Sequence, residues 1–311
     1  MARTYLDIDG ILLLDKPVGM TSNRALQEAK RLLNARKAGH TGSLDPLASG
    51  LLPLCFGEAT KFSRFLLDAD KRYLTVVKLG VSTTTYDGEG EITATRPVAV
   101  ETAAIERALA AFRGEIEQVP PRYSAIKIDG RRMYELARAG REIEVPPRRV
   151  TIYSLELVDR QGDELTLDIR CSKGTYVRSL AHDLGEALGC GGHVARLRRT
   201  ASAGFDVERA VTLEALRALA TPAERAARLL PGDTAVDHLP AVMLSRDAAY
   251  YLRQGQAVSA PHGLPAGWVR LYEDREFLGL GEVQADGQVA PKRLVCRPPA
   301  SERLDRAKEN G

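Results

Sequence analysis

The amino-acid sequence predicts an α+β domain over residues 1–235 and a small β-barrel over residues 240–298. In the first 230 residues, strand-like and helix-like segments are mixed without the regular alternation that is typical of a doubly wound sheet. Around Pro231 to Pro240 the chain changes to short apolar runs broken by glycine and proline, which is typical of a small barrel. A chain of 311 residues is long enough for both units, and residues 299–311 form a polar tail.

The N-terminal elements follow from apolar patterning. The run Ile11 to Leu14 predicts a buried strand, and the Asp-Lys-Pro-Val-Gly segment after it predicts a turn. Thr21 or Ser22 can cap the helix that comes next, whose apolar residues recur at helical spacing on one face. A glycine-rich loop over Gly39–Gly50 and a short helix around Thr60 to Leu67 complete this part of the domain.

Further strands and helices are predicted beyond this loop. A basic, glycine-containing excursion over about residues 121–147 reads as a surface loop, with a short helix from Met133 to Ala139. Threonine, valine and aromatic residues predict the strands, and glycines end the helices. The strands of the first domain are Tyr73–Leu79, Val150–Val158 and Leu165–Cys171, its helices are Thr102–Phe112 and Tyr176–Leu188, and the barrel strands are Trp268–Tyr272, Phe277–Leu280 and Arg293–Cys296.

The composition excludes several classes of protein. It is 44% hydrophobic and 27% charged, as in ordinary globular proteins. No run approaches the roughly eighteen apolar residues of a membrane span, and the N-terminus lacks the apolar region of a signal peptide. We therefore expect a cytoplasmic protein with no membrane partner. The four scattered cysteines form no disulfide framework, and Cys190-Gly-Gly-His193 lacks a second ligand pair, so no metal site is expected.

The positive charge is small in sum but patterned along the chain. The net charge is +3, yet six pairs of adjacent basic residues occur in the first two hundred positions. One such pair is typical of a solvated surface, whereas six favour a face that binds nucleic acid. The pairs begin at Lys30, Arg36, Lys71, Arg131, Arg148 and Arg198.

The glycine-rich loop contains the first candidate for chemistry. Asp45 precedes a proline, which restricts its backbone to an extended or turn geometry, and His40 lies five residues upstream. A carboxylate fixed in such a loop can serve as a nucleophile or a general base. The alternatives are an Asx turn or helix cap for Asp45 and a packing role for His40, which could also contact a base or a phosphate.

A second cluster lies where a predicted strand turns into a helix, at Cys171 to Arg178. Such a turn places backbone N–H groups near an anion, and Arg178 could hold a carboxylate by a charge-assisted pair. The alternative is an ordinary turn with a surface arginine. Tyr73, after Asp70-Lys-Arg, is either half-buried core or a stacking partner for a nucleobase.

Several catalytic signatures are absent from the sequence. It contains no complete dinucleotide fingerprint, phosphate-binding lysine loop or zinc-deaminase signature. Their absence argues against hydride transfer, nucleotide-driven chemistry, zinc chemistry and the usual methyltransferase fold. A cofactor-free reaction on a nucleic acid, centred on one aspartate, remains.

Five ordered blocks carry a resemblance to a known family: Gly10–Pro17, Gly39–Pro46, Asp70–Tyr73, Ser172–Arg178 and Leu197–Arg199. The chain resembles the bacterial tRNA pseudouridine synthase B family over nearly its whole length, to about Arg297. The resemblance implies a catalytic domain with a central mixed, mainly antiparallel sheet and a C-terminal PUA-like, RNA-binding barrel. It also implies conversion of uridine 55 in the T-loop of tRNA to pseudouridine.

The same resemblance implies the catalytic residues Asp45, Tyr73 and Arg178. Asp45 would be the nucleophile, and attack on C6 of the uracil and attack on C1′ of the ribose both stay open. Tyr73 would stack on the target base and carry a proton. Arg178 would pair with Asp45, and we expect it to keep that carboxylate ionised, because a nearby opposite charge lowers a carboxylate pKa.

Substrate-binding roles are implied for further residues. Tyr176 and Leu197 would line the pocket for the base, together with Tyr73, and His40 would contact the displaced nucleotide. Lys16 and the excursion at 121–147 resemble RNA-contacting elements, the latter a thumb that orders on RNA. The implied partner is tRNA, bound through its T-loop and acceptor arm.

Three other functions are weighed against this one. The first is a tRNA-binding or folding factor whose main role is not catalytic, and the second is another base-modifying enzyme such as a methyltransferase. The third is a guide-RNA-dependent synthase, against which Leu47 speaks, because the guide-directed relatives often have lysine directly after Asp-Pro. We expect a monomer with no cofactor, no metal and no obligatory protein partner.

Overall fold

A computed structural model describes residues 5–121, 127–128, 131–132, 145–259 and 263–296. The helix expected from Met133 to Ala139 and the expected polar tail lie outside the described residues. Within the excursion, β8 (Lys127–Ile128) pairs with β9 (Arg131–Arg132) in an antiparallel ladder. No helix in the described ranges is both long and apolar enough to cross a membrane.

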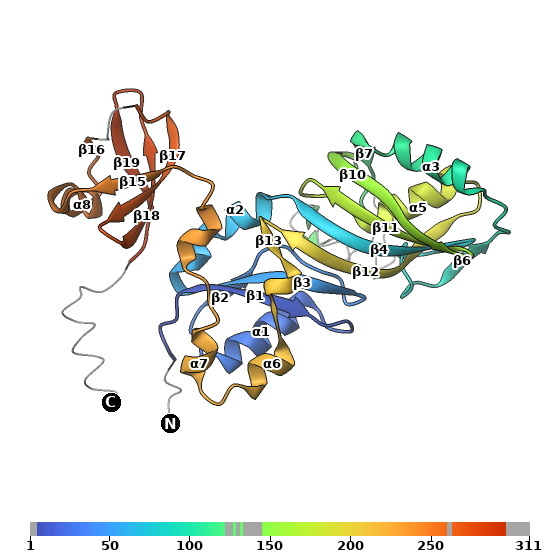
Figure 1. Ribbon diagram of the computed structural model, residues 1–311, viewed down its shortest axis with the longest axis horizontal. Coiled ribbons are helices and arrows are strands. Elements are labelled where there is room, and N and C mark those ends of the chain that lie inside the picture. The colour runs from blue at the N-terminus through green and yellow to red at the C-terminus, as the bar shows by residue number, and fades with distance from the viewer. Residues whose placement is uncertain (1–4, 122–126, 129–130, 133–144, 260–262, 297–311) are drawn as a thin grey trace.

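A ten-stranded mixed sheet is the framework of the molecule (Figure 1). Only the pairs β1–β14 and β3–β12 are parallel, so the prediction of a mixed, mainly antiparallel sheet is confirmed. The strand order is β14 (Val211–Thr212), β1 (Gly10–Lys16), β3 (Ala48–Phe56), β12 (Gly192–Ser202), β4 (Lys71–Leu79), β11 (Glu164–Cys171), β10 (Arg148–Gln161) and β7 (Gly114–Gln118), while β2 (Ala38–His40) pairs with β3 and β13 (Phe205–Asp206) with β12.

Helices cover the apolar face of this sheet in two groups. Figure 1 shows α1 beside β1 and β3, with α6 and α7 close to it, and α3 with α5 over the half that contains β10 and β11. Thr21 caps α1 by accepting a hydrogen bond from the Arg24 N–H, so of the two predicted caps, Thr21 and Ser22, the first is the one observed. The helices are α1 (Ser22–Leu32), α2 (Ser63–Asp68), α3 (Thr102–Ala111), α5 (Val177–Ala187), α6 (Leu213–Ala218) and α7 (Pro222–Ala226), with 3₁₀ turns at Gly57–Phe62 (η1), Val207–Arg209 (η2) and Gly232–Val236 (η3), and a small hairpin of β5 (Val81–Thr83) and β6 (Ile92–Thr95).

Strand β1 is buried on both faces. Leu12 and Leu14 belong to the main core with the helices, whereas Ile11 and Leu13 pack into a second core on the opposite face. A strand with two buried faces reads as a continuous apolar run, which explains why this element was predictable.

The sequence did not predict β3, whose first residues lie within the predicted glycine-rich loop and which contains Pro53. Proline lacks an N–H donor and normally argues against a strand inside a sheet. The Pro53 carbonyl accepts from the Thr41 N–H at 3.1 Å, just beyond the end of β2 at His40. The backbone nitrogen and the carbonyl of one strand residue point to the same neighbouring strand. The nitrogen of Pro53, which has no hydrogen, therefore points toward the β2 side, and the pairing of β3 with β1 on the other side is intact.

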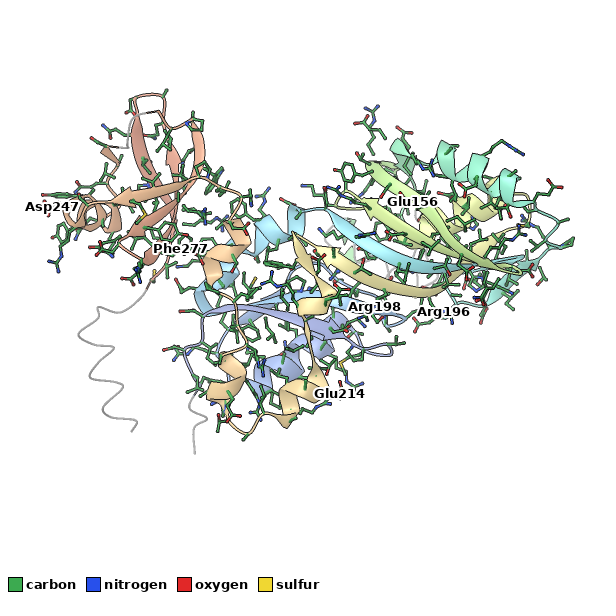
Figure 2. The ribbon with its side chains drawn as sticks, viewed as in Figure 1. Glu156, Arg196, Arg198, Glu214, Asp247 and Phe277 are labelled. Atoms are coloured by element: carbon green, nitrogen blue, oxygen red, sulfur yellow. The ribbon has the colours of Figure 1, made fainter. Side chains whose placement is uncertain are left out.

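The C-terminal sheet has five strands and one helix. Its order is β15 (Ala241–Leu244), β17 (Gly267–Glu273), β18 (Glu276–Val283), β19 (Gln288–Leu294) and β16 (Val258–Ser259), and α8 (Arg246–Arg253) packs against it. The sequence did not predict α8, and β19 ends at Leu294 rather than running from Arg293 to Cys296. Phe277 (Figure 2) contacts Phe62 of η1, with ring centroids 5.3 Å apart, so this sheet shares a core with the larger one.

Gly50 marks the closest approach within the large sheet. Its φ is +102°, and a Cβ at this position would lie 2.3 Å from the Arg199 carbonyl oxygen. We expect Gly50→Ala to lower the free energy of unfolding by about 2–5 kcal/mol, because overpacking and a positive φ add. Urea unfolding should show this loss, whereas Gly39→Ala, where a Cβ meets no atom within 4 Å, should stay close to the wild type. An unchanged midpoint in Gly50→Ala would contradict the predicted clash.

Candidate active site

The loop that contains Asp45 joins β2 to β3 and is held at several points. The Ser22 hydroxyl, at the start of α1, accepts from the Leu44 N–H at 2.7 Å and donates to the Leu44 carbonyl at 3.0 Å. The Gly19 N–H donates to the Pro46 carbonyl at 2.8 Å. These bonds bracket Asp45 on both sides, so its position is fixed by the start of α1 and the turn that precedes it.

Arg178 lies between two carboxylates. Its Nε is 2.9 Å from Asp45 Oδ2, and its Nη1 is 3.3 Å from Asp87 Oδ2 and 3.2 Å from the Thr85 carbonyl. The Arg178 and Asp87 side chains are only 6% and 4% exposed, whereas that of Asp45 is 41% exposed. The structure therefore brings Asp45 and Arg178 together, with the buried pair behind and Asp45 facing solvent.

Asp87 is a member of this site that sequence reasoning missed. Its Oδ1 accepts hydrogen bonds from the Thr85 hydroxyl at 2.5 Å and from the Glu89 N–H at 3.1 Å. The carboxylate of Asp87 therefore holds together the turn that contains it. The Val194 N–H of β12 donates to the Tyr86 carbonyl at 3.0 Å and docks the turn on the large sheet. An acidic, glycine-containing run, Asp87-Gly-Glu-Gly, was the only signal available in the sequence.

Burial has the largest effect on the pKa of the Asp45 carboxyl. It raises the pKa of the Asp45 carboxyl above its ordinary value, and the nearby Asp87 acts in the same direction, whereas Arg178 and Lys16 oppose the change. Arg178 lowers the pKa of Asp45, in the direction expected, and its influence is the second largest after burial. Arg178 offsets the burial of Asp45 and does not exceed it.

Lys16 is fully buried beneath the loop. Its ammonium donates to the Pro17 carbonyl at 2.8 Å and to the Met20 carbonyl at 2.6 Å. Burial lowers the pKa of Lys16 to about 8, although Asp45 acts in the opposite direction. The RNA-contacting role that the family resemblance implies for Lys16 stays a prediction.

Tyr73 and Leu197 lie on neighbouring strands of the large sheet. Tyr73 of β4 is directly opposite Arg199 of β12 in the antiparallel ladder, and the positive charge of Arg199 lowers the pKa of the Tyr73 hydroxyl against the larger effect of burial. Leu197 is opposite Thr75 and also pairs in parallel register with Ala48, just beyond the Asp45 loop. Both side chains belong to the main core, so they extend from the side of the sheet that carries the helices.

Tyr176 precedes α5 and is held through its backbone. The buried Gln118 side chain accepts from the Tyr176 N–H at 2.7 Å and donates to the Tyr176 carbonyl at 3.0 Å. The Ser179 hydroxyl donates to the Val119 carbonyl at 2.7 Å. The end of β7, where the excursion begins, is therefore fastened to the segment that leads into Arg178. Sequence reasoning did not find Gln118.

His40 ends β2 next to the Asp45 loop. Its side chain is partly buried, and its Nδ1 has no hydrogen-bond partner among the described residues. Burial lowers the pKa of His40, and the positive charge of Arg199 acts in the same direction. Both effects favour the neutral imidazole, and the Nδ1 atom without a partner is itself buried.

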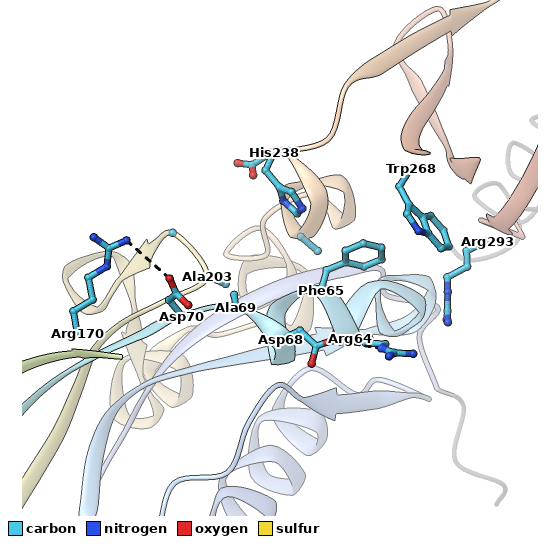
Figure 3. A pocket seen from close by; sticks show the side chains of 13 residues that line it. Arg64, Phe65, Asp68, Ala69, Asp70, Arg170, Ala203, His238, Trp268 and Arg293 are labelled. Carbon is cyan, nitrogen blue, oxygen red and sulfur yellow. Dashed lines mark hydrogen bonds and ion pairs between the residues drawn. The ribbon is translucent and has the colours of Figure 1, made fainter. Parts of the chain in front are cut away.

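A cavity of about 870 Å³ lies elsewhere, between α2, the segment after η3 and the C-terminal sheet (Figure 3). Phe65 and Trp268 meet edge to face there, with ring centroids 5.7 Å apart. Arg170 faces Asp70 at 3.9 Å, and Arg64 faces Asp68 at 3.4 Å. None of the predicted site residues lines this cavity. In the described part of the chain, no cluster of three or more histidine, cysteine, aspartate or glutamate residues could hold a metal ion.

Comparisons with known proteins cover almost the whole chain. Residues 30–177 match the N-terminal domain of TruB family pseudouridylate synthases, residues 178–237 match a tRNA pseudouridylate synthase B C-terminal domain, and residues 240–295 match the C-terminal region of pseudouridine synthase II TruB. The tRNA pseudouridine synthase B of Stutzerimonas stutzeri is 55% identical over 94% of this chain and 97% of its own. That of Aromatoleum aromaticum is 58% identical over 93% of each chain.

The fold of this chain is similar to that of solved structures at lower sequence identity. A chain of an H/ACA RNP bound to a substrate RNA containing 2′-deoxyuridine superposes with a TM-score of 0.70 at 26% identity, over 96% of this chain and 93% of that one. A chain of a Cbf5–Nop10–Gar1 complex gives 0.69 at 28% identity, over 93% and 84%.

Proposed function

The chain belongs to the TruB family of pseudouridylate synthases, and we propose that it converts uridine 55 in the T-loop of tRNA to pseudouridine with Asp45 as the nucleophile. Relatives more than half identical over nearly the full chain are named as tRNA pseudouridine synthases, so tRNA pseudouridylation is its activity. One observation supports Asp45 as the nucleophile. Its carboxylate is partly exposed, lies in a loop held by hydrogen bonds, and has one oxygen 2.9 Å from Nε of the buried Arg178.

The reaction is an isomerisation, with no net gain or loss of atoms. The N1–C1′ glycosidic bond breaks, the base turns, and C5 bonds to C1′; the C5 proton leaves to solvent, and N1 takes up a proton from solvent. One carboxylate can serve as the covalent catalyst, by adding to C6 of the uracil or to C1′ of the ribose. Asp45 is released unchanged in either case, so the residues present suffice without a cofactor.

Neighbouring side chains fit the remaining tasks. Arg178 orients Asp45 and is held in turn by Asp87, which fixes the direction of attack. Tyr73 stacks on the target base and accepts the proton from C5, and Tyr176 and Leu197 complete the pocket. Flipping the base out of its stack costs a few kcal/mol, which stacking of about 1–3 kcal/mol per base offsets. His40 contacts the displaced nucleotide.

The RNA partner is tRNA, held by its T-loop at Asp45 and by its acceptor arm at residues 240–298. We propose that the protein works as a monomer without a guide RNA or a protein partner, in contrast to the relatives in the Cbf5 and H/ACA complexes. Leu47 after the Asp-Pro step supports this choice.

The test is tritium release from a tRNA transcript labelled at uracil C5, with the purified protein and no small molecule. We expect release from the wild-type transcript and none when the T-loop target uridine is replaced by cytidine. A need for an added small molecule would favour a methyltransferase or similar enzyme. Tight tRNA binding without release would favour the binding-factor alternative, and a need for added proteins and RNA would favour a guide-dependent synthase.

The pH dependence of single-turnover rates tests the charge state of Asp45. A nucleophile must be ionised, so activity exists above the pKa of Asp45 and is lost as pH falls through it. Because burial raises that pKa above 3.8, we expect the acid limb to have its midpoint above 3.8. Trp268 fluorescence at each pH reports whether the protein stays folded. A rate that is constant down to pH 4 in folded protein would contradict this charge state.

A further inference from the structure

Arg199 is a buried cation without a buried anion to balance it. Its side chain is only 1% exposed, and no carboxylate in the described part of the chain forms an ion pair with it. Its neighbour Arg198 (Figure 2) points elsewhere and pairs with Asp15 at 2.7 Å. Burying an unpaired charge is expensive unless hydrogen bonds satisfy it, so the contacts of this guanidinium indicate its use.

Three contacts join Arg199 to three parts of the active site. Its Nε donates to the Leu51 carbonyl of β3 at 2.7 Å, and its Nη2 donates to the Gly42 carbonyl of the Asp45 loop at 3.2 Å. The third contact is with Tyr73, which lies directly opposite Arg199 on the neighbouring strand β4, close enough for the guanidinium charge to act on its hydroxyl. One planar side chain thus spans the strand after the nucleophile, the loop of the nucleophile, and the tyrosine.

Two glycines lie against Arg199. A Cβ at Gly50 would lie 2.3 Å from the Arg199 carbonyl oxygen, so this glycine lets the backbones of β3 and β12 approach closely. At Gly42 of the Asp45 loop, φ is +97° and a Cβ would lie 3.6 Å from Arg199 Nη1, so the guanidinium packs directly against the loop backbone.

The charge of Arg199 acts on the groups around Tyr73. Burial raises the pKa of Tyr73, Cys171 and Asp45 act in the same direction, and Arg199 opposes them. A phenol that accepts a proton must first be ionised, and a neighbouring cation favours the ionised form. Arg199, Cys171 and Asp45 are the groups whose charges act most on the Tyr73 hydroxyl, and Lys16, His40 and Lys71 lie near enough to Arg199 to interact with its charge.

We propose that Arg199 is a positioning residue that fixes the Tyr73 hydroxyl relative to the Asp45 loop and supplies the positive charge beside it. The inference rests on the proposed role of Tyr73 in accepting the C5 proton. In that step the C5–H bond breaks, its electron pair stays in the ring, and the proton moves to the Tyr73 oxygen and then to solvent. Arg199 touches neither the RNA nor the proton.

The experiment places 3,5-difluorotyrosine at position 73 of the full chain and follows its ¹⁹F signal with pH, since the acidified ring titrates in an accessible range. In Arg199→Gln, which keeps donors but removes the charge, we expect the midpoint to rise by about one pH unit. Arg199→Lys keeps the charge and should remain near the wild type. Arg198→Met, the matched control on the same strand, should not move it.

Turnover supplies a second readout. With ordinary tyrosine at position 73, Arg199→Gln should reduce the single-turnover rate at least tenfold with tRNA affinity within twofold, and the fluorinated ring should restore part of that rate. An unshifted midpoint in Arg199→Gln, or an equal shift in Arg199→Lys, would overturn the proposal. Because the ¹⁹F titration needs no turnover, an inactive enzyme with the expected shift would refute the proposed function instead.

A measurement that leaves Arg199 in place covers the case in which its variants do not fold. In protein labelled with ¹⁵N-arginine, Tyr73→Phe removes the hydroxyl that Arg199 contacts. We expect the Arg199 guanidinium signals to shift and those of Arg198 to stay. Unchanged Arg199 signals would refute the contact on which the proposal stands.

Discussion

Asp45→Asn should abolish pseudouridine formation while leaving tRNA binding within about twofold of the wild type. The amide has the shape of the carboxylate but cannot act as a nucleophile, so we expect the single-turnover rate to fall by roughly 10⁴-fold or more. The fold should survive, because the Asp45 side chain is 41% exposed and Arg178 keeps its buried partner Asp87.

Filter binding and single-turnover tritium release on the same preparations separate the two effects. Asp163→Asn is the matched control, because Asp163 is an exposed aspartate in the β10–β11 turn whose only ion pair is a 3.8 Å contact with Lys78 within the described chain. It should react at the wild-type rate. Equal loss of binding and rate in Asp45→Asn would mean that the residue holds RNA rather than attacking it.

Asp87→Asn should reduce both activity and stability. Arg178 and Asp87 form the buried half of the site, and leaving a buried charge fully uncompensated costs about 3–5 kcal/mol. We expect a smaller loss of stability here, because Arg178 keeps its ion pair with Asp45 at 2.9 Å. The amide oxygen can still accept from Thr85 and from the Glu89 N–H, so the turn itself should persist. Arg178 then loses one of the two anchors that aim it at Asp45, and we expect a loss in rate of about 10²-fold or more.

Glu89→Gln is the control for this second prediction. Glu89 is an exposed carboxylate in the same turn and forms no ion pair with Arg178 among the described residues. Chemical unfolding and single-turnover rates should show a change of less than about 0.5 kcal/mol in stability and a nearly normal rate. If Asp87→Asn and Glu89→Gln behaved alike, general acidity of the turn would matter, and the Arg178–Asp87 pair would not.

Much of the fold was predictable because local signals agreed with the tertiary structure. The apolar run of β1, the Thr21 cap of α1 and the glycine stops after α3 and α5 each have one physical cause. The failures have physical causes as well. Strand β3 was not predicted, and it contains Pro53, a residue that is unfavourable inside a sheet. Helix α8 was not predicted either, although Ser245 caps it by accepting a hydrogen bond from the Ala248 N–H.

The sequence predicted those residues of the site that stand in a distinctive local sequence, and it did not predict those that only the tertiary packing brings there. Asp45 and Arg178 stand in distinctive local sequence, and the structure places them 2.9 Å apart. Asp87 stands in a polar turn like many others, and only the packing of that turn on β12 brings it to Arg178. Lys16 was named only through the family resemblance, and its RNA-contacting role stays a prediction; nothing in the local sequence indicated that two carbonyls would hold its ammonium inside.

The identity of the product tests the central claim most directly. Unmodified tRNA transcript would be incubated with the purified protein alone and digested to nucleosides for chromatography with mass detection, and the modified position would be mapped by carbodiimide-dependent stops in primer extension. The account predicts one pseudouridine per tRNA, equal in mass to the uridine it replaces and located at the T-loop target, and none with Asp45→Asn. A heavier nucleoside, a product outside the T-loop, or full conversion by Asp45→Asn would contradict it.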